Sequence, residues 1–231
     1  MKLTFAELAK MMDLSVVQAQ HCEKDVRLVA EMAMCHACNA VFTLPCHTAL
    51  LRRLIGDSEV AMGGVVGFPS GGATTEMKMV EAGELIELGC SELDMVINIG
   101  KLKSGRREYV MEDICSVVGA AAGVPVKVVL ECHYLTEDEI RAGCELSIRA
   151  GAAFVKTATG WAPSGATPEN VCFINACTQG KINIKAAGDV SNLETVLEMY
   201  RRGARRFGVG FDSGKNILAQ ADGYPGGLIE F

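Results

Sequence analysis

Four glycines each end a predicted helix, and each is followed five residues later by a position within a short apolar strand. The glycines are Gly89, Gly151, Gly180 and Gly203, and the strand positions are Asp94, Lys156, Lys185 and Gly208. Glycine commonly ends helices because it adopts the left-handed backbone conformation without steric cost. Equal offsets from equivalent helix ends predict that the four strand positions lie at similar heights and point to the same side. The chain is therefore expected to repeat one helix–strand unit.

Short runs rich in β-branched residues alternate with helical stretches along the chain, which is typical of a parallel sheet. We predict eight strands: Met11–Ser15, Ala40–Leu44, Val60–Phe68, Glu92–Asn98, Val126–Glu131, Phe154–Thr157, Asn183–Ala187 and Arg206–Gly210. Eight such units favour a (β/α)8 TIM barrel of the α/β class. The alternative is an open doubly wound sheet, but its glycine-rich first turn is missing. No linker interrupts the alternation, so we expect one domain over residues 1–231, with a short flexible C-terminal tail from about residue 219.

Charge and composition argue against several classes of protein. The net charge is −6 and the basic residues are scattered, so a nucleic-acid surface is not expected. No apolar run reaches the roughly 18 residues that a membrane span needs. Ten cysteines are spread through a sequence that opens without a signal peptide, so we expect reduced thiols and a cytoplasmic location. An enzyme that acts on a small molecule is the class that remains.

Three charged side chains, those of Asp94, Lys156 and Lys185, stand within apolar strands. Such groups are almost never fully buried unless paired, so they form either a structural ion pair or a functional site. Lys156 and Lys185 lie on consecutive predicted strands, which are about 4.8 Å apart in a sheet. Two ammonium groups held that close in a poorly solvated cavity lower the pKa of one toward neutral pH. A neutral lysine forms Schiff bases with carbonyls, Asp94 is placed to move protons, and Glu131 is expected to tune the network.

Around these residues the sequence resembles the deoxyribose-phosphate aldolase family. The matching segments, in family order, are Val65–Pro69, Asp94–Gly100, Leu102–Gly105, Val155–Gly160, Ser164–Thr167 and Ile184–Gly188. The resemblance runs from about residue 8 to about residue 218. It implies a (β/α)8 barrel that reversibly joins acetaldehyde to glyceraldehyde 3-phosphate without a metal or another cofactor, and it allows a homodimer.

The resemblance also implies roles for particular residues. Lys156 is similar to the Schiff-base lysine, Lys185 to the second lysine that lowers its pKa, and Asp94 to the proton-relay aspartate. The resemblance and the strand ends together give an expected set of substrate-binding residues: Thr159, Gly160, Gly188, Gly208 and Cys46. Cys46 is equally well explained as a packing thiol.

Several positions depart from the family pattern near the expected phosphate site. Asp189 stands where the family has a second glycine, Asp212 lies in an extended last loop, and Trp161 follows Gly160 in place of a small or basic residue. Two carboxylates near a phosphate would oppose its binding. An aldolase acting on an unphosphorylated or differently charged substrate therefore remains an alternative, as does a barrel that binds a metabolite without turnover.

Three further motifs have both a functional and a structural interpretation. The Cys35–Cys38 segment has the spacing of half a zinc site, but it also falls late in a helical stretch, where cysteine packs as a small apolar residue. Arg201, Arg202, Arg205 and Arg206 form a basic cluster that we interpret as surface, away from the catalytic end. Tyr224 in the tail is either an analogue of the family's mobile tyrosine or part of a frayed terminus.

Overall fold

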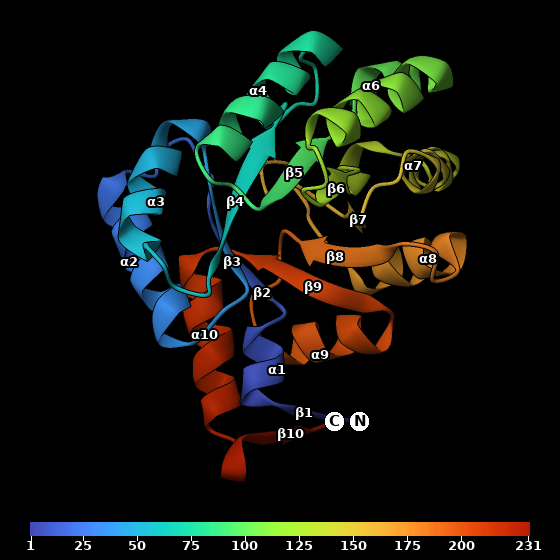
Figure 1. The fold of residues 1–231 in the computed structure, drawn as a ribbon. Helices are drawn as coiled ribbons and strands as arrows, with labels where there is room; N and C mark the ends of the chain where they lie inside the picture. Colours follow the sequence, from blue (N-terminus) through green and yellow to red (C-terminus); the bar gives the residue numbers. More distant parts are fainter.

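A closed barrel of eight parallel strands forms the centre of the molecule (Figure 1). The computed structural model describes residues 1–231. The barrel strands are β2 (Met12–Val16), β3 (Ala40–Thr43), β4 (Ala61–Val66), β5 (Glu92–Val96), β6 (Val126–Val129), β7 (Phe154–Lys156), β8 (Asn183–Ala187) and β9 (Ala204–Val209). Each pairs with the next in sequence, and β9 pairs back with β2. The predicted (β/α)8 barrel is confirmed, and the open sheet is excluded.

Helices cover the outside of the barrel, one main helix after each strand. They are α2 (Glu23–Cys35), α3 (Thr48–Ile55), α4 (Thr75–Glu87), α6 (Arg107–Ala120), α7 (Glu137–Arg149), α8 (Pro168–Thr178), α9 (Leu193–Arg201) and α10 (Phe211–Asp222). Short helical turns precede three of them: η1 (Pro45–His47) before α3, α5 (Ile99–Lys103) before α6 and η2 (Cys132–Tyr134) before α7. The main apolar core lies between strands and helices. None of the helices has the length and apolar character needed to cross a membrane.

The four helix-ending glycines have the predicted conformation, with φ between 73° and 116°. The four positions five residues later all line one cavity inside the barrel. Lys156 pairs directly with Lys185 across β7 and β8. Gly208 pairs instead with Ala187, because the ladder between β8 and β9 is irregular at Ile184 and Lys185. The prediction that the four positions point to the same side is therefore confirmed. The prediction that they lie at the same height is wrong for Gly208.

A buried ion pair fixes the outer helices against the end of β5. The Lys78 Nζ on α4 lies 2.6 Å from the Asp113 Oδ2 on α6, and neither side chain is exposed. The same Nζ donates a hydrogen bond of 3.0 Å to the carbonyl oxygen of Val96. Because Val96 is two residues beyond Asp94, this pair also holds the strand that carries Asp94.

The C-terminal segment differs from the predicted tail. Residue 219 lies inside α10, which continues to Asp222, and after the turn η3 (Pro225–Gly227) the strand β10 (Leu228–Glu230) pairs antiparallel with β1 (Lys2–Thr4). The short helix α1 (Phe5–Ala9) connects β1 to the start of β2, and both termini lie together below it (Figure 1). Tyr224 packs against the core at the end of α10, which is opposite to the carboxyl ends of the barrel strands. Tyr224 therefore does not reach the cavity, because the helix before it runs away from the mouth.

Candidate active site

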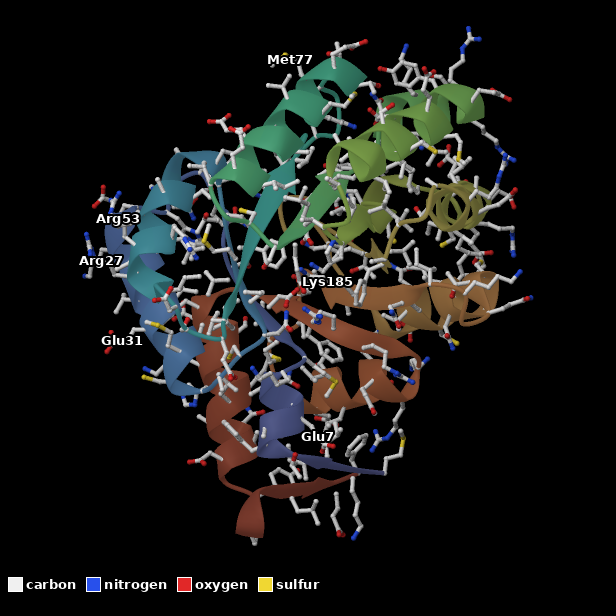
Figure 2. The ribbon with its side chains drawn as sticks, viewed as in Figure 1. Glu7, Arg27, Glu31, Arg53, Met77 and Lys185 are labelled. Atoms are coloured by element: carbon white, nitrogen blue, oxygen red, sulfur yellow. The ribbon has the colours of Figure 1, made fainter.

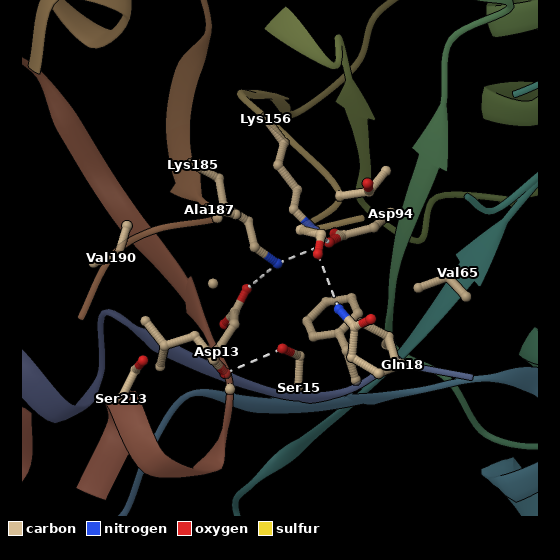
Figure 3. A pocket seen from close by; sticks show the side chains of 18 of the residues that line it. Asp13, Ser15, Gln18, Val65, Asp94, Lys156, Lys185, Ala187, Val190 and Ser213 are labelled. Atoms are coloured by element: carbon tan, nitrogen blue, oxygen red, sulfur yellow. Dashed lines mark hydrogen bonds and ion pairs between the residues drawn. The ribbon is translucent and has the colours of Figure 1, made fainter. Parts of the chain in front are cut away.

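The two strand lysines and Asp94 meet at the centre of the barrel. Figure 2 places Lys185 in the middle of the molecule, and Figure 3 shows Lys156 and Lys185 both directed at the Asp94 carboxylate. The Asp94 Oδ2 lies 2.8 Å from the Lys156 Nζ and 2.9 Å from the Lys185 Nζ. Lys156 is only 7% exposed, and Asp94 and Lys185 are more deeply buried. One carboxylate oxygen thus bridges two amines at the floor of a cavity.

A second carboxylate holds Lys185 from the opposite side. The Asp13 Oδ2, on β2, lies 2.7 Å from the Lys185 Nζ. The same ammonium also makes a cation–π contact with the ring of Phe42, whose centroid lies 3.9 Å from the Nζ. Lys185 therefore has two anionic partners, whereas Lys156 has one and stands nearer the cavity. These surroundings favour a charged Lys185 over a charged Lys156.

Three further charged side chains lie beneath this group, and the sequence analysis missed them as members of the site. The Lys127 Nζ is 2.6 Å from the Glu92 Oε2 and 3.4 Å from the Asp94 Oδ1. The Arg206 guanidinium is 2.9 Å from the Asp13 Oδ1 and 3.2 Å from the Glu92 Oε2. The surface assignment of Arg206 is wrong, because β9 begins at Ala204 and directs this side chain into the barrel. Lys127 could have been predicted from the sequence, because it is a charged residue within the otherwise apolar strand β6.

The numbers of charges indicate which lysine is least favoured in its charged form. Four basic groups (Lys127, Lys156, Lys185 and Arg206) share the interior with three carboxylates (Asp13, Glu92 and Asp94). Burial penalises any excess charge, so the cluster is balanced when one amine is neutral. Lys156 has the fewest partners and is the group that balances it.

The directions of the pKa shifts agree with this balance. Burial lowers the pKa of the Lys156 ammonium, and Lys185 and Lys127 lower it further, although Asp94 opposes them. Burial also disfavours the charged form of Lys185, but Asp13 and Asp94 outweigh it and raise the pKa of its ammonium. Burial disfavours the charged form of Asp94, but the positive charges of Lys156, Lys185 and Lys127 outweigh this effect and hold the pKa of the carboxyl below its usual range. At neutral pH the site combines a lysine with an increased neutral fraction, a charged lysine and a carboxylate.

Four of the five expected substrate-binding residues line the cavity, which has a volume of about 180 Å³. These four are Thr159, Gly160, Gly188 and Gly208. At Gly208 the reason for glycine is steric, because a Cβ there would come within 3.1 Å of the Lys185 Cε. Cys46 does not line this cavity, because Pro45 begins the turn η1 directly after β3 and leaves the Cys46 side chain exposed. The expectation for Cys46 is corrected accordingly.

Two acidic residues with left-handed backbones clamp the loop after β7. Glu131 (φ 57°) follows β6, and its Oε2 accepts hydrogen bonds from the Thr159 amide, at 3.1 Å, and from the Thr159 hydroxyl. Asp189 (φ 56°) follows β8, and its Oδ2 accepts a 2.6 Å hydrogen bond from the Gly165 amide. Glu131 therefore organises the loop and does not contact the lysines, contrary to its expected tuning role. Asp189 lines the cavity and also anchors the loop.

The Cys35–Cys38 segment separates in the structure. Cys35 is exposed at the end of α2, whereas Cys38 is buried in the main core, and burial raises the pKa of the Cys38 thiol to about 12. No group of three or more His, Cys, Asp or Glu side chains is arranged to hold a metal ion. Packing in the core explains Cys38, whereas Cys35 lies on the surface.

Comparison with known proteins identifies the family. Residues 7–220 match the model of the DeoC/LacD family aldolases. The chain is 47% identical over 228 residues to a deoxyribose-phosphate aldolase of Klebsiella pneumoniae, with 97% of this chain and 92% of the relative covered. A relative of the same description from Sinorhizobium medicae is 45% identical over 225 residues, covering 97% of this chain and 91% of the relative.

Two solved structures extend the agreement to three dimensions. QR15, an aldolase, superposes with a TM-score of 0.87 at 33% identity, covering 92% of this chain and 94% of its own. The deoxyribose phosphate aldolase of Aeropyrum pernix, described as a unique tetramer, gives a TM-score of 0.85 at 27% identity, covering 95% of this chain and 93% of its own. With a matching fold, a family match over nearly the whole length and a lysine pair at the barrel centre, this chain belongs to the DeoC/LacD family of aldolases.

Proposed function

We propose that this protein is a class I aldolase that cleaves 2-deoxyribose 5-phosphate to acetaldehyde and glyceraldehyde 3-phosphate through a Schiff base on Lys156. The observation that carries the proposal is the Asp94 carboxylate bridging two buried amines, of which only Lys156 has a lowered pKa. The identity of the sugar is inferred from relatives described as deoxyribose-phosphate aldolases.

The proposed reaction begins when the neutral Lys156 Nζ attacks C1 of the open-chain sugar. Loss of water from the carbinolamine gives the imine, which draws electrons from the C2–C3 bond. A base removes the proton of the C3 hydroxyl, the C2–C3 bond breaks, and glyceraldehyde 3-phosphate leaves. The resulting enamine takes a proton at C2, and water hydrolyses the imine to release acetaldehyde. Asp94, held by Lys156 and Lys185, is the group in reach to exchange these protons.

The two ends of the cavity suit the two ends of this substrate. Val17, Phe42 and Val65 form an apolar wall near the lysines, which fits the acetaldehyde portion. Gly210 and Ser213 line the opposite part, where α10 begins without a side-chain cap. The free N–H groups of a helix N-terminus favour an anion, so this end is the proposed place of the phosphate.

The function is tested by borohydride trapping with acetaldehyde. Reduction of the imine should attach a two-carbon group to Lys156, because it is the lysine with the lowered pKa beside the cavity. Peptide mapping by mass spectrometry locates the label. Labelling confined to exposed lysines such as Lys181 would rule out the imine mechanism and leave a metabolite-binding barrel.

A second candidate substrate is the unphosphorylated sugar, and one observation favours it. The only lysine or arginine side chains that line the cavity are Lys156 and Lys185, while Asp189 adds a carboxylate. Asp212 lies instead in a neighbouring groove beside His21 and Asp25. The charge of Asp189 is therefore the feature to test.

Asp189→Asn is expected to increase kcat/KM for deoxyribose 5-phosphate relative to deoxyribose by roughly fivefold. The reason is that repulsion between an exposed carboxylate and a nearby phosphate costs about 1 kcal/mol of binding free energy. The asparagine oxygen can still accept the Gly165 hydrogen bond, so the loop keeps its anchor while the charge is removed. Asp189→Gly removes both the charge and the hydrogen bond to Gly165, so it should reduce activity on either sugar. Asp222→Asn removes an exposed charge at the opposite end of α10 from the cavity; it is the matched control and should leave the ratio unchanged. An unchanged ratio in Asp189→Asn would mean that this carboxylate does not sense the phosphate.

We also propose a homodimer in the cytoplasm. Met77, Met79 and Val80 expose apolar side chains on α4, and the Aeropyrum pernix relative is described as an oligomer. The ten free cysteines fit a reducing compartment. Light scattering coupled to gel filtration measures the assembly directly.

A further inference from the structure

Two hydrogen bonds join the loop after β7 to the loop after β2 across the mouth of the barrel. The Trp161 indole Nε1 donates to the carbonyl oxygen of Val17 at 2.8 Å. In return, the Gln18 amide, labelled in Figure 3, donates to the carbonyl oxygen of Gly160 at 2.9 Å. Both bonds connect residues more than 140 positions apart in sequence. The loop after β7 is thus tied across the mouth at two adjacent points, and the indole makes one of the two bonds.

A third loop holds the same indole. The Phe68 ring, in the loop after β4, meets Trp161 edge to face, with 6.1 Å between centroids and 87° between planes. Phe68 itself packs against the small apolar cluster inside the barrel, formed by Val17, Ala40, Phe42 and Val65. The backbone amide of Trp161 adds a 3.0 Å bond to the Thr159 hydroxyl, which Glu131 holds in turn. Three loops and one buried carboxylate therefore fix the position of one ring.

The Trp161 ring stands at the boundary of two spaces: it lines the outer one, and Val17, which accepts its indole hydrogen bond, lines the inner one. One is the cavity of about 180 Å³ over Lys156, with Gln18 and Gly160 on its rim. The other is a side chamber of about 400 Å³ that is open to solvent, and its apolar lining includes Pro69, Ile99, Tyr134 and Trp161. Thr159 is the one residue that lines both spaces. The larger, mainly apolar space therefore meets the Lys156 cavity at Thr159, and Trp161, which is 40% exposed, stands beside this junction.

We propose that Trp161 is a specificity-determining residue that excludes bulky apolar aldehydes by walling off the side chamber from the Lys156 cavity. This inference rests on the proposed function and concerns the second aldehyde of the same reaction. In the condensation direction, the enamine carbon on Lys156 bonds to the carbonyl carbon of that aldehyde, whose oxygen takes a proton. Its remaining atoms must fit the space above Lys156, and a ring fits only if the wall is removed.

Trp161→Ala should join the two spaces and admit such aldehydes. For condensation with acetaldehyde, kcat/KM is measured with propanal, 3-methylbutanal and phenylacetaldehyde as second aldehydes. The ratio of phenylacetaldehyde to propanal should rise about tenfold or more in Trp161→Ala, the scale at which apolar pockets discriminate by size. Trp161→Leu is measured in parallel, because a partial opening should give a smaller rise in the same ratio.

Two control variants isolate the wall from other effects. Trp161→Phe loses the hydrogen bond to Val17 but keeps a ring, so it should retain the wild-type ratio. Tyr134→Ala enlarges the side chamber but leaves Trp161 in place, so it should also retain that ratio. The wall is disproved if Trp161→Ala and Trp161→Leu keep the wild-type ratio, or if Trp161→Phe changes it as much as Trp161→Ala does.

Borohydride trapping of acetaldehyde is run on every variant. Wild-type protein that traps nothing on Lys156 contradicts the proposed function itself. If Trp161→Ala and Trp161→Leu trap normally but show no change in the ratio, only the role of Trp161 is contradicted.

Discussion

Lys156→Ala should lower kcat for sugar cleavage by on the order of 10⁴-fold or more, the scale of losing a covalent nucleophile. Lys156 is the amine with a lowered pKa, and it has a single carboxylate partner at the cavity floor. Lys185 cannot replace it, because Asp13 and Asp94 hold its proton. Cleavage is followed by an enzyme-coupled assay for the released aldehyde.

The matched control for this variant is Lys181→Ala, which removes an exposed lysine just before β8. It should retain wild-type kcat, and Lys156→Ala should retain the wild-type circular dichroism spectrum. If Lys156→Ala turned over at a rate within tenfold of the wild type, another group would have to carry the covalent step.

Lys185→Leu should reduce activity at neutral pH and move the rising limb of the pH profile to higher pH. The Lys185 charge is one of the causes that lower the pKa of Lys156. Without that charge the pKa of Lys156 rises, and a smaller fraction of Lys156 is neutral at a given pH. The rate of borohydride trapping, measured from pH 6 to pH 10, reports this fraction without the later steps.

The same variant should also lose stability. Removing Lys185 leaves Asp13 and Asp94 buried without their shared cation, and breaking a buried pair from one side costs about 3–5 kcal/mol. Urea unfolding measures the change in free energy of unfolding, with Lys181→Leu as the exposed control. A pH profile that stays in place while stability falls would mean that Lys185 has a structural role only.

The fold and the upper part of the site could be predicted because they follow from repetition. A glycine at each helix end and a fixed offset to the strand located Asp94, Lys156 and Lys185, whose charges contrast with the apolar strands around them. Lys127 and Arg206 follow the same rule of a charge in a strand. Arg206 was misassigned because three more arginines lie close to it in sequence, and an isolated cluster of that kind is usually on the surface.

The loop residues could not be predicted, because their roles depend on backbone geometry and distant partners. Asp189 looked like an obstacle to phosphate, whereas its left-handed conformation turns one carboxylate oxygen onto the Gly165 amide. Trp161 was visible only as a departure from the family pattern. Its partners Val17 and Phe68 come from two other loops, and nothing in the local sequence connects them.

The shared partners of the buried charges have a consequence for how this barrel can change over evolutionary time. Asp94 contacts three lysines, and Asp13 contacts Lys185 and Arg206 at under 3 Å. Groups that share partners give non-additive effects when mutated together. Once one of these charges has been replaced, replacing one of its partners should cost less than it does in the original protein. Substitutions at these positions should therefore occur in coupled pairs. Directed evolution of this barrel should accordingly randomise these positions jointly, since single-site libraries would score each of them as immutable.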